Sequence, residues 1–264
     1  MSDYSRAGIV ETAQDMADAA GAAILPWFRT DIAATNKDQT GFDPVTEADR
    51  AAEKAMRAVL KKQRPEDAIL GEEFGATEGS SGLTWVLDPI DGTRAFISGA
   101  ASWGVLIGVT DANGPILGVI DQPYTRERWI CGPDLARFDG PMGTRPLATR
   151  GTTHLQDATL FTTFPEVGTV DEGAAFHRVA GACRLTRYGL DCYAYGLLAL
   201  GQIDLVIEAG LHAYDICGPA AVVAGAGGIV TDWQGGPAHE GGQVIAAATP
   251  ALHAAALALL AGQG

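Results

Sequence analysis

The sequence is poor in basic residues. Of its 264 residues, 18 are lysine or arginine and 32 are aspartate or glutamate, which gives a formal net charge of −14. A strongly acidic surface repels nucleic acid and anionic membranes, so we expect neither as a partner. The same charge argues against a non-enzymatic role as an RNA-associated protein. Most of the carboxylates serve solubility, but some of them can also gather around cations.

Cysteine and histidine are scarce as well, and their spacing matches no familiar zinc site. The four cysteines form no CxxC pair, and the five histidines form no HExxH pattern. Such cysteines are typical of buried or reduced thiols in a cytoplasmic protein.

Long apolar runs are also missing. No stretch of 18 uncharged apolar residues occurs, which predicts no membrane-spanning helix. The segment Met1–Arg6 lacks a basic region followed by an apolar run, so we expect no signal peptide. Together these absences favour a cytoplasmic location.

The chain is long enough for one large core, and no linker or charge run divides it. We expect a single α/β domain over residues 1–264, with subdomains at about 1–145 and 146–264. Apolar residues recur at helical spacing from Ser5 to Phe28, and a second helix begins near Thr46. Short apolar strands follow, and further helices are predicted at 191–200 and 214–226.

The strongest local signal is the segment Trp85–Thr93, in which an apolar strand runs directly into Asp88 and Asp91. Pro89 and Gly92 favour a tight turn that aims both carboxylates and the Ile90 carbonyl at one point. Oxygen ligands of this kind suit a hard cation such as Mg²⁺. Taken alone, the segment is equally compatible with an ordinary acidic turn.

Three other acidic segments lie at the ends of predicted elements. Glu72 and Glu73 follow a strand, Asp43 to Asp49 spans a helix start, and Asp215 begins an apolar helix. For each segment alone, solvated charge or helix capping is the simpler interpretation. Jointly, four acidic segments at element ends predict a metal site at a sheet edge.

In order and spacing, these segments resemble the signature of the inositol-monophosphatase superfamily, and the similarity covers about residues 5 to 235. The resemblance implies a layered αβαβα sandwich with the active site between its halves, and a homodimer. It also implies a magnesium-dependent phosphatase acting on a small phosphate ester. The sequence departs from the family after Asp215, where Ile216-Cys217-Gly218 replaces the usual alanine-alanine-glycine.

The resemblance assigns roles to particular residues. It implies that Mg²⁺ is held by Glu72, Asp88, the carbonyl of Ile90, Asp91 and Asp215. It further implies that Asp49 and Thr93, together with Glu72, act in catalysis by orienting and activating the attacking water, and that the amides of Gly92 and Thr93 bind phosphate.

The segment Arg187–Tyr195 resembles the histidinol-phosphate phosphatase branch of the superfamily. This predicts hydrolysis of L-histidinol phosphate in histidine biosynthesis, with a substrate-binding set of Asp91, Arg187, Gly189, Asp191 and Glu208. A cationic substrate gives Asp191 and Glu208 something to pair with, which inositol phosphate does not.

Several alternatives stay open at this stage. Asp191 can instead cap the following helix. Inositol 1-phosphate, or a broad set of small esters, is the competing substrate class. A bisphosphatase is less favoured because no basic cluster for a second phosphate is visible, and a non-enzymatic scaffold is the distant alternative.

Overall fold

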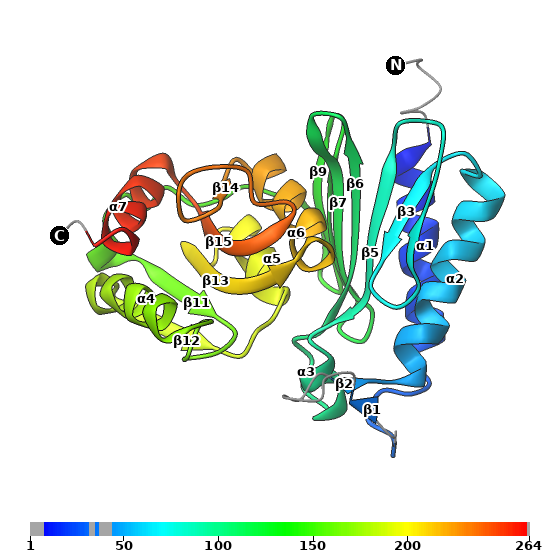
Figure 1. Ribbon diagram of the computed structural model, residues 1–264, viewed down its shortest axis with the longest axis horizontal. Coiled ribbons are helices and arrows are strands. Elements are labelled where there is room, and N and C mark those ends of the chain that lie inside the picture. The colour runs from blue at the N-terminus through cyan, green and yellow to red at the C-terminus, as the bar shows by residue number, and fades with distance from the viewer. Residues whose placement is uncertain (1–7, 32–34, 37–43, 263–264) are drawn as a thin grey trace.

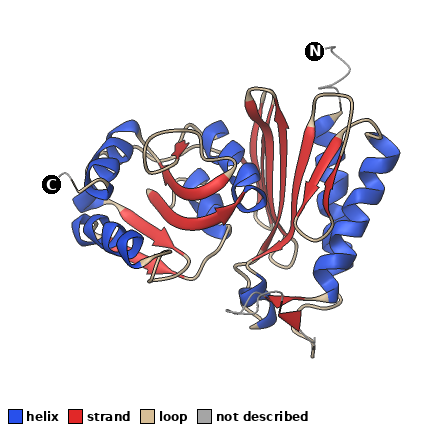
Figure 2. Cartoon of the chain, in the orientation of Figure 1, coloured by secondary structure: helices blue, strands red, loops and turns tan. Residues whose placement is uncertain are grey.

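The computed structural model describes residues 8–31, 35–36 and 44–262, which form five stacked layers (Figures 1 and 2). A helix pair, an eight-stranded sheet, a second helix pair, a five-stranded sheet and a third helix pair follow one another. This arrangement confirms the αβαβα sandwich expected from the sequence. Within the described ranges, every helix is too short or too polar to cross a membrane.

The first layer contains α1 (Ile9–Ile24) and α2 (Glu47–Gln63). The helix buries six of the apolar positions that predicted it: Ile9, Ala13, Met16, Ala17, Ala20 and Ile24. It is shorter than the predicted range, and Ser5 lies outside the described residues. Thr46 caps α2: its hydroxyl accepts from the Ala48 amide, and the carboxylate of Asp49 accepts from the Thr46 amide. The predicted helix start near Thr46 is therefore confirmed.

The eight-stranded sheet has the order β10-β9-β8-β7-β6-β5-β3-β4. Its strands are β3 (Ala68–Gly71), β4 (Gly75–Thr77), β5 (Thr84–Asp91), β6 (Gly104–Asp111), β7 (Gly114–Gln122), β8 (Glu127–Gly132), β9 (Leu135–Gly140) and β10 (Gly143–Pro146). β3 and β5 run parallel, whereas the other pairs are antiparallel. Because β3 and β5 end at the same edge, their two acidic segments emerge side by side. A separate two-stranded sheet joins β1 (Thr35–Asn36) to β2 (Pro44–Val45).

The middle layer contains α5 (Tyr193–Ala199) and α6 (Ala213–Gly225) between the two sheets (Figure 1). α6 touches β7 with its backbone: a Cβ atom on Gly118 would lie 2.1 Å from the Gly218 carbonyl oxygen. Only glycine allows so close an approach of helix to sheet. The contact places the first turn of α6, and with it Asp215, beside the end of β5.

The second sheet has the order β12-β11-β13-β15-β14 and is covered on its outer face by α4 (Val170–Ala182) and α7 (Pro250–Leu260). Its strands are β11 (Thr159–Thr162), β12 (Leu185–Tyr188), β13 (Leu205–His212), β14 (Ile229–Thr231) and β15 (Gly241–Ala247). The first sheet ends at Pro146 and the second begins at Thr159. The division of the domain near residue 145 stays a prediction, because one buried cluster contains residues of both sheets.

The predicted helix at 191–200 begins two residues later than expected, at Tyr193. Asp191 has a left-handed backbone, with φ of 46°, which a helix does not tolerate. The predicted helix at 214–226 is α6 and differs by one residue at each end.

Candidate active site

A cavity of about 320 Å³ opens between the two sheets, at the ends of β5 and β13 and the start of α6. Among the described residues, six carboxylates line it: Glu72, Asp88, Asp91, Asp191, Glu208 and Asp215. Arg94 is the one lysine or arginine among those lining residues, and His212 is the one histidine. The cavity is therefore a strongly negative space.

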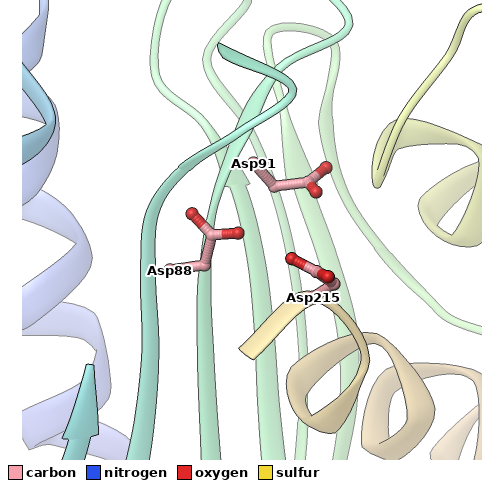
Figure 3. Close-up of side chains that lie close together, drawn as sticks. All are labelled: Asp88, Asp91 and Asp215. Carbon is pink, nitrogen blue, oxygen red and sulfur yellow. The ribbon is translucent and has the colours of Figure 1, made fainter. Parts of the chain in front are cut away.

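Asp88, Asp91 and Asp215 form the core of this cavity (Figure 3). Each offers one carboxylate oxygen, and the three oxygens lie within 4.8 Å of one another. Figure 3 shows the two β5 carboxylates facing the one at the start of α6. The structure thus brings together three of the residues predicted to hold metal.

A β-bulge allows the side chains of Asp88 and Asp91 to lie on the same side of the sheet. Residues three apart in a regular strand point to opposite faces of the sheet. Asp88 pairs with Leu106 and Asp91 with Gly104, so β5 gains one residue over β6 between these positions. The extra residue turns both carboxylates toward the cavity. The segment predicted as a tight turn is therefore a bulged strand, with Pro89 at the irregularity.

Backbone amides orient all three carboxylates of the core. Asp88 accepts from the Ile90 amide at 3.0 Å, Asp91 from the Cys192 amide at 2.7 Å, and Asp215 from the His212 amide at 2.6 Å. Each bond fixes one oxygen of a carboxylate. The other oxygen is then held in a defined direction, as a preorganised ligand requires.

The electrostatics of the core favour binding of a cation. Burial raises the pKa of Asp88 well above its ordinary value, and the charges of Glu72 and Asp91 raise it further. Burial likewise raises the pKa of Asp91, followed by the charges of Asp191 and Asp215. Carboxylates in this state are costly to ionise together unless a cation neutralises them. An all-oxygen site of this kind suits Mg²⁺ or a similar hard ion.

Ile90 and Thr93 also lie at the cavity wall. The Thr93 hydroxyl donates to the Ile90 carbonyl at 3.2 Å. Gly92, with a left-handed φ of 80°, caps α3 (Thr93–Ile97). The motif therefore places the Ile90 carbonyl and the Thr93 hydroxyl next to the acidic core.

Asp49 is buried and does not line the cavity. Its Oδ2 accepts from the amide and the hydroxyl of Thr46, while its Oδ1 is buried with no hydrogen-bond partner among the described residues. Burial raises the pKa of Asp49 to about 6, and the charge of Glu72 adds to this. Asp49 and Thr93, to which the resemblance assigns a joint role, are not hydrogen-bonded to each other, because the Thr93 hydroxyl donates to the Ile90 carbonyl.

Asp191 lines the cavity and does not cap a helix. α5 has Cys192 as its N-cap residue, with no side-chain capping bond, so the capping alternative is wrong. The Asp191 carboxylate instead accepts from the Ser102 hydroxyl at 3.1 Å. Burial raises its pKa, against the opposing effects of Ser102 and Arg94.

Glu208 faces the same cavity from β13 and is 7% exposed. Thr163 donates to Oε1 through both its hydroxyl and its amide, at 2.5 and 3.2 Å, and the Tyr195 hydroxyl donates to Oε2 at 2.8 Å. Burial raises the pKa of Glu208, while these hydrogen bonds lower it. Both oxygens of this carboxylate are therefore fixed in place by neutral donors.

Arg187 and Gly189 are not brought to the cavity. Arg187 belongs to β12, the edge strand of the second sheet, and both residues are exposed and absent from the cavity lining. Their predicted role in substrate binding finds no support in the geometry of this chain.

Several residues of the site were not predicted from the sequence. Arg94 lines the cavity, and its guanidinium lies 5.0 Å from the centre of the Phe164 ring, which joins α3 to the segment after β11. The position of Arg94 directly after Thr93 could have indicated it. Nothing local marks Ser102 or Thr163, because their roles depend on partners 89 and 45 residues away.

Comparison with known proteins identifies relatives along most of the chain. A plant protein named bifunctional phosphatase IMPL2, from Arabidopsis thaliana, is 43% identical over 222 residues, which are 83% of this chain but 63% of the plant protein. A histidinol-phosphatase from Mycobacterium tuberculosis is 34% identical, over 77% of this chain and 79% of that protein.

Solved structures and a family model agree with these matches. A structure of an inositol monophosphatase from Zymomonas mobilis is 42% identical and has a TM-score of 0.86, covering 99% of this chain and 100% of that one. The model of the inositol monophosphatase family matches residues 6–263. Together with the acidic cavity at the sheet edge, this shows that the chain is a member of the inositol monophosphatase family of phosphatases.

Proposed function

We propose that this phosphatase hydrolyses L-histidinol phosphate to L-histidinol and phosphate, a reaction of histidine biosynthesis, and that it requires Mg²⁺. The observation that carries the proposal is the pair of carboxylates, Asp191 and Glu208, on the cavity wall beside the acidic core. Histidinol phosphate has an ammonium group and an imidazole, both able to pair with carboxylates, whereas inositol phosphate offers only hydroxyls.

The residues of the core fit a magnesium site. Glu72, Asp88, the Ile90 carbonyl, Asp91 and Asp215 all line the cavity and supply oxygen ligands only. When bound, Mg²⁺ would neutralise the phosphate and lower the pKa of a bound water molecule, so that the water can lose a proton at neutral pH. The buried carboxylates described above are the groups that such an ion would stabilise in their charged form.

The remaining catalytic roles fall to groups around the core. The Thr93 hydroxyl, at the cavity wall, would orient the attacking water. The Oδ1 atom of Asp49, which has no hydrogen-bond partner among the described residues, would accept the proton of that water through the Thr93 hydroxyl. The amides of Gly92 and Thr93 would hold phosphate oxygens.

Substrate discrimination would rest on fixed carboxylates. Thr163 and Tyr195 hold Glu208, and Ser102 holds Asp191, so neither has to reorganise when a cationic substrate enters. A site built to pair with a charged group rejects an analogue that lacks it, because the buried polar groups are then left without a partner. Asp91 lines the same cavity and completes the proposed contact set.

Hydrolysis of inositol 1-phosphate is the competing function. The 42% identity to an inositol monophosphatase structure supports it, as the name of the Mycobacterium tuberculosis relative supports histidinol phosphate. The two substrates share the metal chemistry and differ in what Asp191 and Glu208 meet. A homodimer, expected from the family resemblance, stays a prediction.

The test is a ratio of specificity constants. For Asp191→Ala, kcat/KM for histidinol phosphate should fall. The fall should correspond to a loss of roughly 1.5–3 kcal/mol of transition-state stabilisation, the size of a charge-assisted hydrogen bond. kcat/KM for inositol 1-phosphate should change little, because the metal ligands are untouched. An unchanged ratio between the substrates would defeat the histidinol assignment and favour the inositol one.

Thr169→Ala provides a matched control. It removes the capping box of α4, on the outer face of the second sheet, and should lower the melting temperature without changing the substrate ratio. If Asp191→Ala behaved like this control, Asp191 would be structural.

A further inference from the structure

A buried carboxylate on α2 supports the loop that carries Glu72. Glu53 is fully buried and pairs with Arg57 one turn later, Nε to Oε1 at 2.7 Å. It also accepts two backbone amides from the loop between β3 and β4: that of Glu73 at 2.7 Å and that of Phe74 at 3.3 Å. Helix and loop are therefore joined through a single side chain.

Arg57 binds the strand that follows this loop, β4. Its guanidinium donates to the Gly75 carbonyl at 2.5 Å and to the Thr77 hydroxyl at 3.0 Å. Glu53 also packs closely against the end of β3, where a Cβ atom on Gly71 would lie 2.0 Å from Glu53 Oε1. Glu53 and Arg57 together therefore hold the end of β3, the loop and the start of β4.

These contacts fix the backbone on both sides of Glu72. The Glu72 amide donates to the Leu87 carbonyl at 3.1 Å, which holds the peptide plane before its Cα atom. The Glu73 amide donates to Glu53, which holds the peptide plane after it. With both planes fixed, φ and ψ of Glu72 are fixed, and so is the direction in which its side chain leaves the backbone toward the cavity.

We propose that Glu53 is a positioning residue for Glu72 and thereby sets the metal affinity of the cavity without touching metal or substrate. This rests on the proposed function, in which Glu72 is a metal ligand. Outer contacts that orient a ligand commonly change metal affinity by about 10- to 100-fold when removed.

The opposite end of β3 offers a matched control. Asp67 is also buried and pairs with an arginine, Arg64 Nε at 2.7 Å, and it accepts from the Trp85 indole at 2.8 Å. This pair precedes β3, whereas Glu53 holds the loop after it. Neither Asp67 nor its two partners lines the cavity. Loss of either buried pair should destabilise the fold, but only loss of Glu53 should change the orientation of the Glu72 side chain.

The experiment measures Mg²⁺ binding by calorimetry, without substrate, in wild type, Glu53→Gln and Asp67→Asn, with melting temperatures alongside. Glutamine keeps the size of Glu53, but it loses the charge and turns one acceptor into a donor. We expect Mg²⁺ affinity to fall about 10- to 100-fold in Glu53→Gln and to stay at the wild-type value in Asp67→Asn. kcat of Glu53→Gln should recover at saturating Mg²⁺.

Equal Mg²⁺ affinity in Glu53→Gln and Asp67→Asn would overturn the proposal and leave Glu53 a structural residue. If Glu53→Gln does not fold, Glu53→Asp serves instead: it keeps the charge one methylene short and should lower the affinity by a smaller factor, and an unchanged affinity would also overturn the proposal. Glu72→Gln is the reference for the proposed function. If it bound Mg²⁺ as wild type does, the ligand assignment itself would fail, separately from the role of Glu53.

Discussion

Buried carboxylates have opposite surroundings in two regions of the molecule. Away from the cavity they face arginines: Asp121 pairs with Arg128 at 2.6 Å, and Asp204 pairs with Arg150. In the cavity, within the described part of the chain, Asp88 forms no ion pair with lysine or arginine and faces other carboxylates instead. The two regions bury the same chemical group under contrary conditions.

The pKa values record the difference. Burial acts to raise the pKa of Asp204, but hydrogen bonds from Arg150 and the Thr159 amide outweigh it and the pKa falls. For Asp88 every neighbouring charge acts in the same direction as burial, and the pKa rises. Asp204 is therefore compensated in the folded protein, whereas burial still raises the pKa of Asp121 against the opposing effect of Arg128. The cavity holds uncompensated repulsion that binding of a cation would relieve.

Exchanging a charge for an amide in each region should give the largest contrast. Asp88→Asn should nearly abolish phosphate release, because a ligand charge is lost, while the metal-free protein melts at or above the wild-type temperature. Asp204→Asn should lower the free energy of unfolding by about 3 kcal/mol, because it leaves Arg150 without its partner, and should keep the activity of the folded fraction. Phosphate release and thermal melting, measured on both variants, check this.

Two outcomes for Asp88→Asn would contradict this contrast between the cavity and the paired carboxylates. Wild-type turnover in Asp88→Asn would remove Asp88 from the metal site. A destabilised, metal-free Asp88→Asn protein would mean that the carboxylate stabilises the fold and that the repulsion in the cavity is already relieved without a metal.

Thr93→Ala sharpens the comparison, since it alters the cavity without altering its charge. The variant should lower kcat about 100-fold through loss of water alignment, with KM and Mg²⁺ affinity little changed. Thr93→Ser keeps the hydroxyl and is the control that should retain most of the activity. Steady-state kinetics at saturating Mg²⁺ make the measurement. A raised KM with normal kcat would assign Thr93 to phosphate binding alone.

The last prediction concerns the dependence of stability on pH. Burial raises the pKa of both Asp49 and Asp215 to about 6 from 3.8. Because these pKa values are higher in the folded than in the unfolded protein, the folded state binds the extra protons. The metal-free protein should therefore gain roughly 1–3 kcal/mol per group as the pH falls through 6 toward 4, and lose it as the pH rises again.

Denaturant unfolding at a series of pH values, with chelator or with Mg²⁺, tests this. Bound Mg²⁺ should flatten or reverse the trend, because it favours the charged carboxylates. A metal-free protein that loses stability between pH 6 and pH 4 would show that paired carboxylates such as Asp204 dominate the titration.

The sequence predicted what depends on neighbours in the chain. The capping of α2 by Thr46, the five layers and the acidic strand end were all accessible, since each has a local pattern or a family motif. The direction of the strands could not be predicted from the sequence. Only the parallel pairing of β3 with β5 brings Glu72 beside Asp88, and no local signal encodes that pairing.

Conformation and distant contacts limited the rest. The sequence indicated either a cap or a ligand for Asp191, and its left-handed backbone with the bond to Ser102 decided against the cap. The β-bulge was mistaken for a turn because proline and glycine favour both. Glu53 went unnoticed because, in sequence, a glutamate four residues before an arginine is typical of an exposed helix face.

The contact between Gly118 and the carbonyl of Gly218 limits how closely α6 can approach β7. It sets how deeply α6 seats against the first sheet, and therefore how far Asp215 stands from the two β5 carboxylates. The width of the acidic cavity is then set by contact between backbone atoms rather than by side-chain rotamers. The apolar core around α6 can exchange its side chains without resizing the cavity, whereas one methyl group added at Gly118 would shift the helix and widen it.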